Sequence, residues 1–170
     1  MKIESKTKEF MNFLYPDFMV RVVRLFNDFH DLTGLELRIT EGIRTLDRQK
    51  ELYSQGRDAP GPIVTKAKPG QTMHHYGVAC DVCRIGKDPW DLPWDDFGRL
   101  ARAQGLVWGG DWKKMPDKPH LEITYAGATH EDLYKLMLAG GIDTVWAYFD
   151  TVRGVPVGSE WYGPQKKVRI

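Results

Sequence analysis

The sequence predicts an α+β fold in which helices surround a small, mainly antiparallel sheet. The chain has 170 residues, which corresponds to one domain and suffices for a hydrophobic core. Segments in which apolar residues recur with helical spacing are interspersed with short segments that alternate as strands do. The composition, with 42% hydrophobic and 28% charged residues, is that of an ordinary globular protein.

The first half of the chain predicts a helix, a strand and a second helix. Apolar residues recur on one helical face across residues 18–29. Apolar and polar side chains alternate over residues 35–40, as in a half-buried strand. Thr45 is suited to cap a helix over residues 46–55. Proline and glycine recur through residues 57–73, which predicts a long surface loop that could form a lid or rim.

The second half predicts two more strands among three helices. Residues 78–83 are short, apolar and strand-like, and residues 95–104 fit a short helix that ends before a glycine. The residues of segment 120–125 alternate between two faces of a strand. A capped helix over residues 130–139 and a further helix near residues 142–149 complete the predicted order.

Charge and hydropathy exclude several classes of protein. The formal net charge is +1, so the chain lacks the strong basic field of a nucleic-acid-binding protein. No apolar run approaches the roughly 18 residues of a membrane span, so we expect no stable membrane insertion. Five of the first nine residues are charged, and this segment contains no apolar signal region.

Two cysteines, Cys80 and Cys83, form a single CxxC pair. A structural zinc site usually needs two such pairs, and no thioredoxin-like context surrounds this one. Cys83 falls on the same strand face as Asp81, so we expect it near the functional residues without being a ligand. Cys80 points the other way and is expected in the core.

Three residues have the side chains and spacing of a catalytic metal site. A catalytic zinc ion takes three protein ligands and keeps one position for water. His74, Asp81 and His120 would supply this set. Residues seven apart in a straight strand point to opposite faces, so His74 and Asp81 need a bend between them, and Gly77 allows it.

A zinc hydrolase also needs a base that does not bind the metal. Asp117 and Glu122 both qualify, and the residue types alone do not choose between them. His75, beside the first ligand, either contacts substrate or faces water. An aromatic wall could line a groove, although most tryptophans of a domain this size belong to the core. Its members would be Tyr76, Trp90, Trp94, Trp108 and Trp112.

Four motifs in order resemble one enzyme family. The resemblance is to the D-Ala-D-Ala-peptidase branch of the LAS-type zinc peptidases, and most closely to phage L-alanyl–D-glutamate endopeptidases. It covers about residues 35–125. The motifs are Gly42-Ile43-Arg44-Thr45-x-x-x-Gln49-x-x-Leu52-Tyr53-x-x-Gly56-Arg57, His74-x-x-Gly77-x-Ala79-x-Asp81, Trp108-Gly109-Gly110-Asp111-Trp112 and Asp117-x-Pro119-His120.

The resemblance implies a role for each matching position. His74, Asp81 and His120 match the Zn²⁺ ligands. Asp117 matches the catalytic general base and acid, which ranks it above Glu122. Arg44 matches the arginine that holds the substrate and stabilises the developing oxyanion, a role for which a fixed guanidinium is suited.

The resemblance also implies a function. It predicts a peptidoglycan hydrolase, an endolysin, that cuts the stem peptide between L-Ala and D-Glu. A D-Ala-D-Ala carboxypeptidase or dipeptidase on the same scaffold is the nearer alternative, and a non-catalytic zinc-containing wall-binding protein is the further one.

The expected organisation follows from the same comparison. Residues 1–153 would form a monomeric catalytic domain with a hedgehog/D-Ala-D-Ala-peptidase-like fold, and residues 154–170 an extended tail. The protein would stay in the host cytoplasm until lysis and then act on the cell wall.

Overall fold

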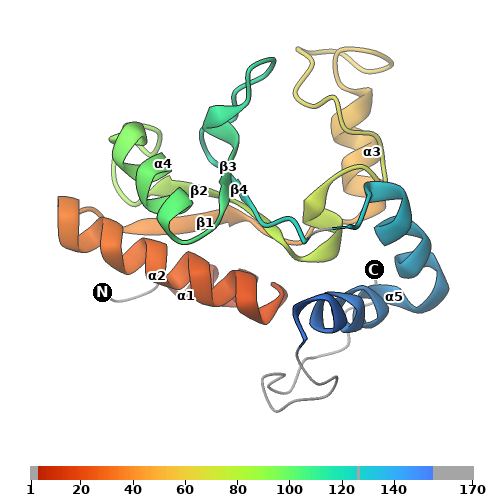
Figure 1. Cartoon of the computed structure of the whole chain (residues 1–170). Helices are drawn as coiled ribbons and strands as arrows, with labels where there is room; N and C mark the ends of the chain where they lie inside the picture. Colours follow the sequence, from red (N-terminus) through yellow and green to blue (C-terminus); the bar gives the residue numbers. More distant parts are fainter. Residues whose placement is uncertain (1–3, 126, 155–170) are drawn as a thin grey trace.

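The computed structural model describes residues 4–125 and 127–154. Its centre is a four-stranded antiparallel sheet with strand order β1-β2-β4-β3 (Figure 1). The antiparallel sheet confirms the sequence-based prediction, which gave neither the strand order nor the fourth strand. The strands are β1 (Leu37–Glu41), β2 (Ala79–Arg84), β3 (Val107–Trp108) and β4 (His120–Glu122). The helices are α1 (Ser5–Met11), α2 (Pro16–Thr33), α3 (Leu46–Ser54), α4 (Trp94–Ala103) and α5 (His130–Arg153), with short 3-10 turns η1 (Met73–Tyr76) and η2 (Gly109–Asp111).

The core lies on one face of the sheet. Helix α2 runs beneath the strands and buries Phe18, Val22 and Phe26 completely, which confirms the predicted helical face (Figure 1). Ile39 and Val82, which pair across β1 and β2, point into the same core. The opposite face of the sheet stays free to carry polar side chains.

The structure departs from the sequence-based expectations at the short elements. Helix α1, turns η1 and η2, and strand β3 were not expected, because each is too short to show a periodic pattern. The strand expected over residues 120–125 ends at Glu122. The two expected late helices are both present within α5, because its backbone is non-helical at Gly140 and Gly141, where one helix ends and the next begins.

Gly77 joins the turn η1 to the strand β2 and supplies the bend that the sequence predicts. Its φ of 68° lies in the left-handed region. Its carbonyl accepts a hydrogen bond from Tyr15 N (2.8 Å), and the Trp146 indole donates to the carbonyl of Tyr76 (2.9 Å). These bonds fix η1 against α2 and α5, and so fix His74 and His75, which it carries.

We expect Gly77→Ala to destabilise the protein more than Gly34→Ala. Both glycines have φ near 70°, so alanine costs about 1–2 kcal/mol of backbone strain at either position. A Cβ at Gly77 would also lie 2.9 Å from the carbonyl oxygen of Phe13, whereas one at Gly34 meets nothing within 4 Å. Urea denaturation should show an excess loss of at least about 1 kcal/mol for Gly77→Ala. Equal losses would refute this packing argument.

Tyr15 couples the start of α2 to α5 and leads to a prediction at alkaline pH. Burial, aided by the hydrogen bond to Asp150 (2.6 Å), raises the pKa of Tyr15 to about 12. The folded-state pKa lies above the unfolded value of about 10, so the neutral phenol stabilises the fold below pH 10. This contribution is lost as the pH rises towards 12. Between pH 10 and 12, the Tm of the Tyr15→Phe variant should therefore fall less than the Tm of the wild type. Parallel curves of Tm against pH would contradict this.

Among the described residues, none of the helices has both the length and the apolar character that crossing a bilayer requires. The tail expected over residues 154–170 lies outside the described residues except for Gly154, which ends α5.

Candidate metal and catalytic site

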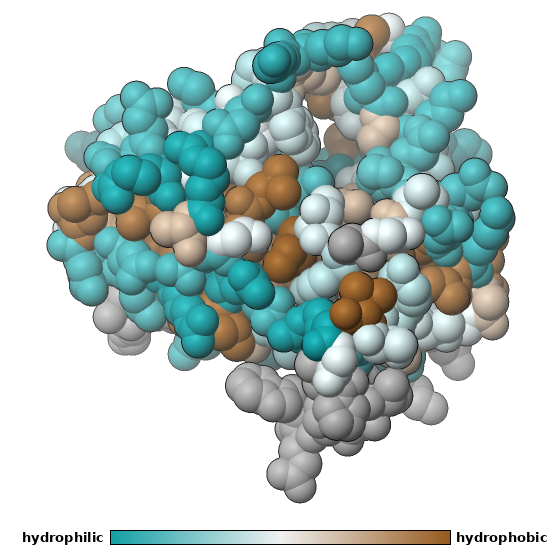
Figure 2. Space-filling view, viewed as in Figure 1, coloured by the Kyte–Doolittle hydropathy of each residue, from teal (hydrophilic) through white to brown (hydrophobic). Residues whose placement is uncertain are grey.

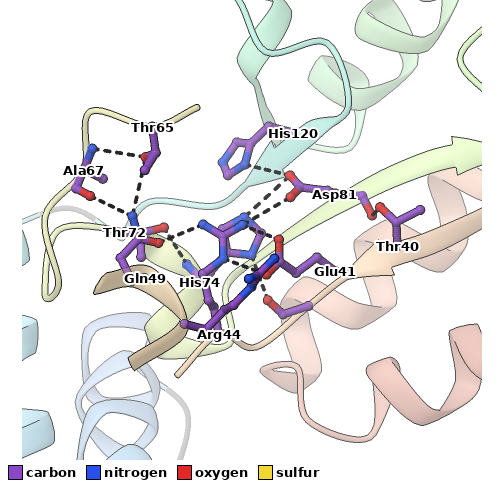
Figure 3. Close-up of polar contacts among 12 residues, drawn as sticks. Thr40, Glu41, Arg44, Gln49, Thr65, Ala67, Thr72, His74, Asp81 and His120 are labelled. Carbon is purple, nitrogen blue, oxygen red and sulfur yellow. Dashed lines mark hydrogen bonds and ion pairs between the residues drawn. The ribbon is translucent and has the colours of Figure 1, made fainter. Parts of the chain in front are cut away.

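His74, Asp81 and His120 converge on the free face of the sheet (Figure 3). His74 comes from turn η1, while Asp81 and His120 are paired residues on β2 and β4. Asp81 Oδ1 lies 3.5 Å from His74 Nε2 and 3.2 Å from His120 Nδ1. One ligand atom from each residue lies within 4.8 Å of the other two. The structure thus brings together the three residues that the sequence singled out.

The outer nitrogen of each histidine is held by an oxygen. His74 Nδ1 lies 2.7 Å from the carbonyl of Gly42, and because a carbonyl only accepts, this nitrogen carries the proton. His120 Nε2 lies 3.1 Å from Glu122 Oε2. The inner nitrogens, His74 Nε2 and His120 Nδ1, are thereby directed at Asp81. Holding the outer nitrogen of a metal-binding histidine in this way orients its ring.

This donor set suits a divalent metal ion. Two imidazole nitrogens and a carboxylate are ligands that zinc accepts. Ligand atoms about 2.0–2.1 Å from a tetrahedral zinc would lie roughly 3.3 Å apart. The two separations from Asp81, 3.5 and 3.2 Å, match this spacing. His74, Asp81 and His120 could therefore hold the metal.

The charges of the site favour an ionised Asp81. Burial opposes its ionisation, but the hydrogen bonds from His120 and His74 outweigh burial and hold the pKa of Asp81 well below its usual range. Burial also lowers the pKa of His120, yet its bonds to Asp81 and Glu122 raise that pKa to about 9.

Arg44 is fixed beside this group by contacts on three sides. Its guanidinium donates two hydrogen bonds to Glu41 (2.8 and 2.5 Å) and one to Gln49 Oε1 (2.9 Å). It also lies 3.4 Å from Asp81 Oδ2. The Arg44 side chain is only 9% exposed. Such a bidentate pair with a carboxylate holds the guanidinium plane in one orientation.

Glu41 and Gln49 were missed as site residues by the sequence analysis. Gln49 is fully buried on α3, and its amide donates to the carbonyl of Ala67 (2.7 Å), which ties the 57–73 loop to Arg44 (Figure 3). The signal for Gln49 was its place in the motif with Arg44. The signal for Glu41 was a carboxylate at the end of β1, three residues before that arginine.

Asp117 is held at the mouth of the site by the tryptophan- and glycine-containing motif. The Trp108 indole donates to the carbonyl of Lys118 (2.7 Å), and Asp117 N donates to the carbonyl of Gly109 (2.9 Å). A Cβ on Gly109 would lie 2.4 Å from the Asp117 carbonyl oxygen, so only glycine permits this approach. Partial burial of the carboxyl, together with repulsion by Asp81, raises the pKa of Asp117.

A groove passes over these residues. One part, of about 690 Å³, lies between residues 64–67 of the long loop and the segment of Trp112 and Met115. The molecule is hollowed between these two projections, which stand above the sheet (Figures 1 and 2). The 57–73 loop therefore forms a rim of the groove. The Trp112 ring also packs against His120, with ring centres 4.9 Å apart.

Two expectations about neighbouring residues are decided by the structure. His75 was expected to contact substrate or to face water. Both alternatives are wrong, because His75 is only 1% exposed and does not line the groove. Its Nδ1 donates to the carbonyl of Arg44 (2.7 Å) and so braces that arginine's backbone. Cys83 lies outside the candidate ligand group and its sulfur accepts from Arg38 Nε (3.3 Å), while Cys80 belongs to the core.

The expected aromatic wall is only partly present. Trp112 and Trp90 line the groove. Trp108 and Tyr76 are buried instead. Trp94 packs on the core.

Part of the chain is similar to a peptidase family described as D-alanyl-D-alanine carboxypeptidase. The family model described by that name matches residues 65–123, which include the candidate ligands and Asp117. The sequence is 41% identical over 103 residues to the peptidoglycan L-alanyl-D-glutamate endopeptidase CwlK of Bacillus subtilis (strain 168), covering 53% of this chain and 62% of that protein. These similarities confirm the resemblance to the LAS-type peptidases.

Two further proteins similar to this chain also bear the name of an L-alanyl–D-glutamate peptidase. The L-alanyl-D-glutamate peptidase of Listeria phage A118 is 33% identical over 109 residues, which cover 59% of this chain and 34% of the phage protein. The solved structure of the L-Ala D-Glu endopeptidase ChiX of Serratia marcescens superposes with a TM-score of 0.50 and 26% identity, covering 74% of this chain and 91% of that chain. The chain thus spans less than two thirds of the length of the two relatives matched by sequence.

Proposed function

We propose that the protein is a zinc-dependent peptidoglycan hydrolase that cleaves the L-Ala–D-Glu bond of the stem peptide. The observation that carries the proposal is the convergence of His74, Asp81 and His120 beside Asp117 and Arg44. The relatives are named as peptidases of the L-alanyl–D-glutamate bond, and these names support the choice of bond.

Each residue around the ligands would have a separate role in amide hydrolysis. Bound zinc would supply a Lewis acid that acidifies water and polarises a carbonyl. Asp117, at the mouth of the site, would accept the proton of the attacking water and return it to the leaving nitrogen. Arg44 would stabilise the negative charge that develops on the carbonyl oxygen, because Glu41 and Gln49 hold its guanidinium in place.

A carboxypeptidase is the second candidate, because the matching family model carries that description. The shape of the groove favours an endopeptidase. A second hollow, of about 570 Å³, meets the first at Glu41, Asp81 and Asp117. A carboxypeptidase needs room for only one residue beyond the scissile bond, whereas an endopeptidase needs room for a longer substrate on both sides.

Two synthetic peptides test the choice of bond. One carries an internal L-Ala–D-Glu bond and a blocked C-terminus, and the other ends in free D-Ala-D-Ala. We expect the full-length, zinc-loaded protein to cut only the first, as followed by liquid chromatography. Release of D-Ala from the second without cleavage of the first would replace the endopeptidase by a carboxypeptidase.

We expect Glu122→Gln to weaken zinc binding about 10- to 100-fold, which is the usual effect of losing a carboxylate that holds a metal-binding histidine. The Glu122 carboxylate contacts His120 Nε2, and the variant removes its charge but keeps its shape. Competition with a chromophoric chelator measures the affinity. Glu131→Gln, on an exposed side chain of α5, is the matched control. Unchanged affinity with a large loss of rate would instead return Glu122 to the role of base.

The remaining expectations follow from this proposal. An endolysin would accumulate in the host cytoplasm and act on the wall at lysis, and one of the relatives is a phage protein. The division into a domain of residues 1–153 and a tail, and the monomeric state, stay predictions.

A further inference from the structure

The second hollow differs in chemistry from the first. Its walls come from α1, the end of β1, the start of α3 and the connection that follows β2. They carry Trp90, whose side chain is 56% exposed, together with Ile43 and Arg48. The first hollow carries Lys66 and Trp112, but the Trp112 ring packs against His120. Arg48 of the second hollow is paired with Glu51 (3.1 Å), whereas Lys66 is exposed on the rim of the first. The two ends of the groove are thus suited to different groups.

The stem peptide has the same asymmetry about its L-Ala–D-Glu bond. On the D-Glu side it carries carboxylates, which a lysine attracts. On the other side only L-Ala separates the scissile bond from the lactyl group of N-acetylmuramic acid. Any substrate that extends past L-Ala in this direction presents a sugar ring.

The residues of the second hollow are suited to a sugar. One face of a pyranose consists of C–H groups, and these pack on the electron-rich face of an indole such as Trp90. The hydroxyl and N-acetyl groups need hydrogen-bonding partners, which Arg48 and Glu41 offer at the same hollow.

We propose that the second hollow is a saccharide subsite in which Trp90 stacks on the N-acetylmuramic acid residue of the substrate. The proposal rests on the proposed function, because that function places the sugar next to the scissile bond. It assigns the direction of the substrate, with the glycan at Trp90 and the D-Glu carboxylates towards Lys66.

A binding experiment tests the subsite without turnover. N-acetylmuramyl-L-alanine lacks the scissile bond, and N-acetyl-L-alanine is its sugar-free counterpart. In NMR titrations of the full-length protein, we expect the first compound to shift the Trp90 indole signal and to bind at least about fivefold more tightly than the second. Trp90→Ala should remove this difference, whereas Trp90→Phe should keep most of it. Leu138→Ala, an exposed apolar residue on α5, is the control for surface truncation.

A kinetic experiment tests the same contact in the reaction. Two substrates share one peptide, and either N-acetylmuramic acid or acetyl blocks the L-Ala nitrogen. The wild-type ratio of kcat/KM for the muramyl over the acetyl peptide should be roughly 10, and Trp90→Ala should bring it close to 1.

The outcomes separate the two proposals. Equal binding of both fragments, or a kcat/KM ratio that Trp90→Ala leaves unchanged, would overturn the saccharide subsite. Cleavage of neither peptide, with fragment binding that still depends on Trp90, would overturn the proposed reaction and support the subsite.

Discussion

Asp117→Asn is expected to lower kcat/KM for stem-peptide hydrolysis at least about 100-fold, the usual scale of general acid–base catalysis. The amide has the size of the carboxylate but does not accept the proton of the attacking water. The backbone bonds that hold the turn, from Asp117 N to Gly109 and from His120 N to the Asp117 carbonyl, are retained. The fold and the bound zinc should therefore be unchanged.

The measurement combines steady-state rates across pH with metal analysis. The wild-type rate should fall at acid pH as the base is protonated, and the residual rate of the variant should lack this limb. Asp143→Asn makes the same chemical change on an exposed position of α5 and should behave as wild type. A variant with nearly normal kcat/KM would remove Asp117 from the mechanism.

His120→Ala is expected to abolish zinc binding and activity together. The alanine removes one of three donor atoms and also the group through which Glu122 acts. A site with two remaining ligands, His74 and Asp81, binds zinc much more weakly. Elemental analysis after dialysis should find about one zinc per wild-type chain and close to none in the variant.

Controls separate metal loss from misfolding. His30→Ala removes a histidine near the end of α2, far along the chain from the ligand group, and should retain zinc and activity. Circular dichroism should show that the His120→Ala variant keeps its secondary structure. Retention of stoichiometric zinc by this variant would contradict the ligand assignment.

The sequence predicted the three converging residues because their spacing is linked to elements it also predicted. Asp81 lies on an apolar strand and His120 opens another, so antiparallel pairing brings them face to face. His74 needed a bend, and Gly77 was the residue able to provide it. The helical face of α2 was equally evident, because its periodicity extends over several turns.

Other features depend on contacts between distant segments and could not be predicted from local pattern. Glu41, Gln49 and the backbone of Ala67 form one network around Arg44 only after α3 and the long loop are folded. No periodic pattern surrounds His75 in the sequence, so its burial could not be predicted. It is buried because the turn η1 directs it inward. Helix α1 has seven residues, and a helix this short is stabilised by packing rather than by its own sequence.

Mass spectrometry of purified peptidoglycan, digested with and without a zinc chelator, tests the central claim most directly. The account predicts new L-Ala carboxyl ends and D-Glu amino ends that appear only when the chelator is absent. Loss of terminal D-Ala alone, or no new ends despite one bound zinc per chain, would contradict a zinc-dependent L-alanyl–D-glutamate endopeptidase.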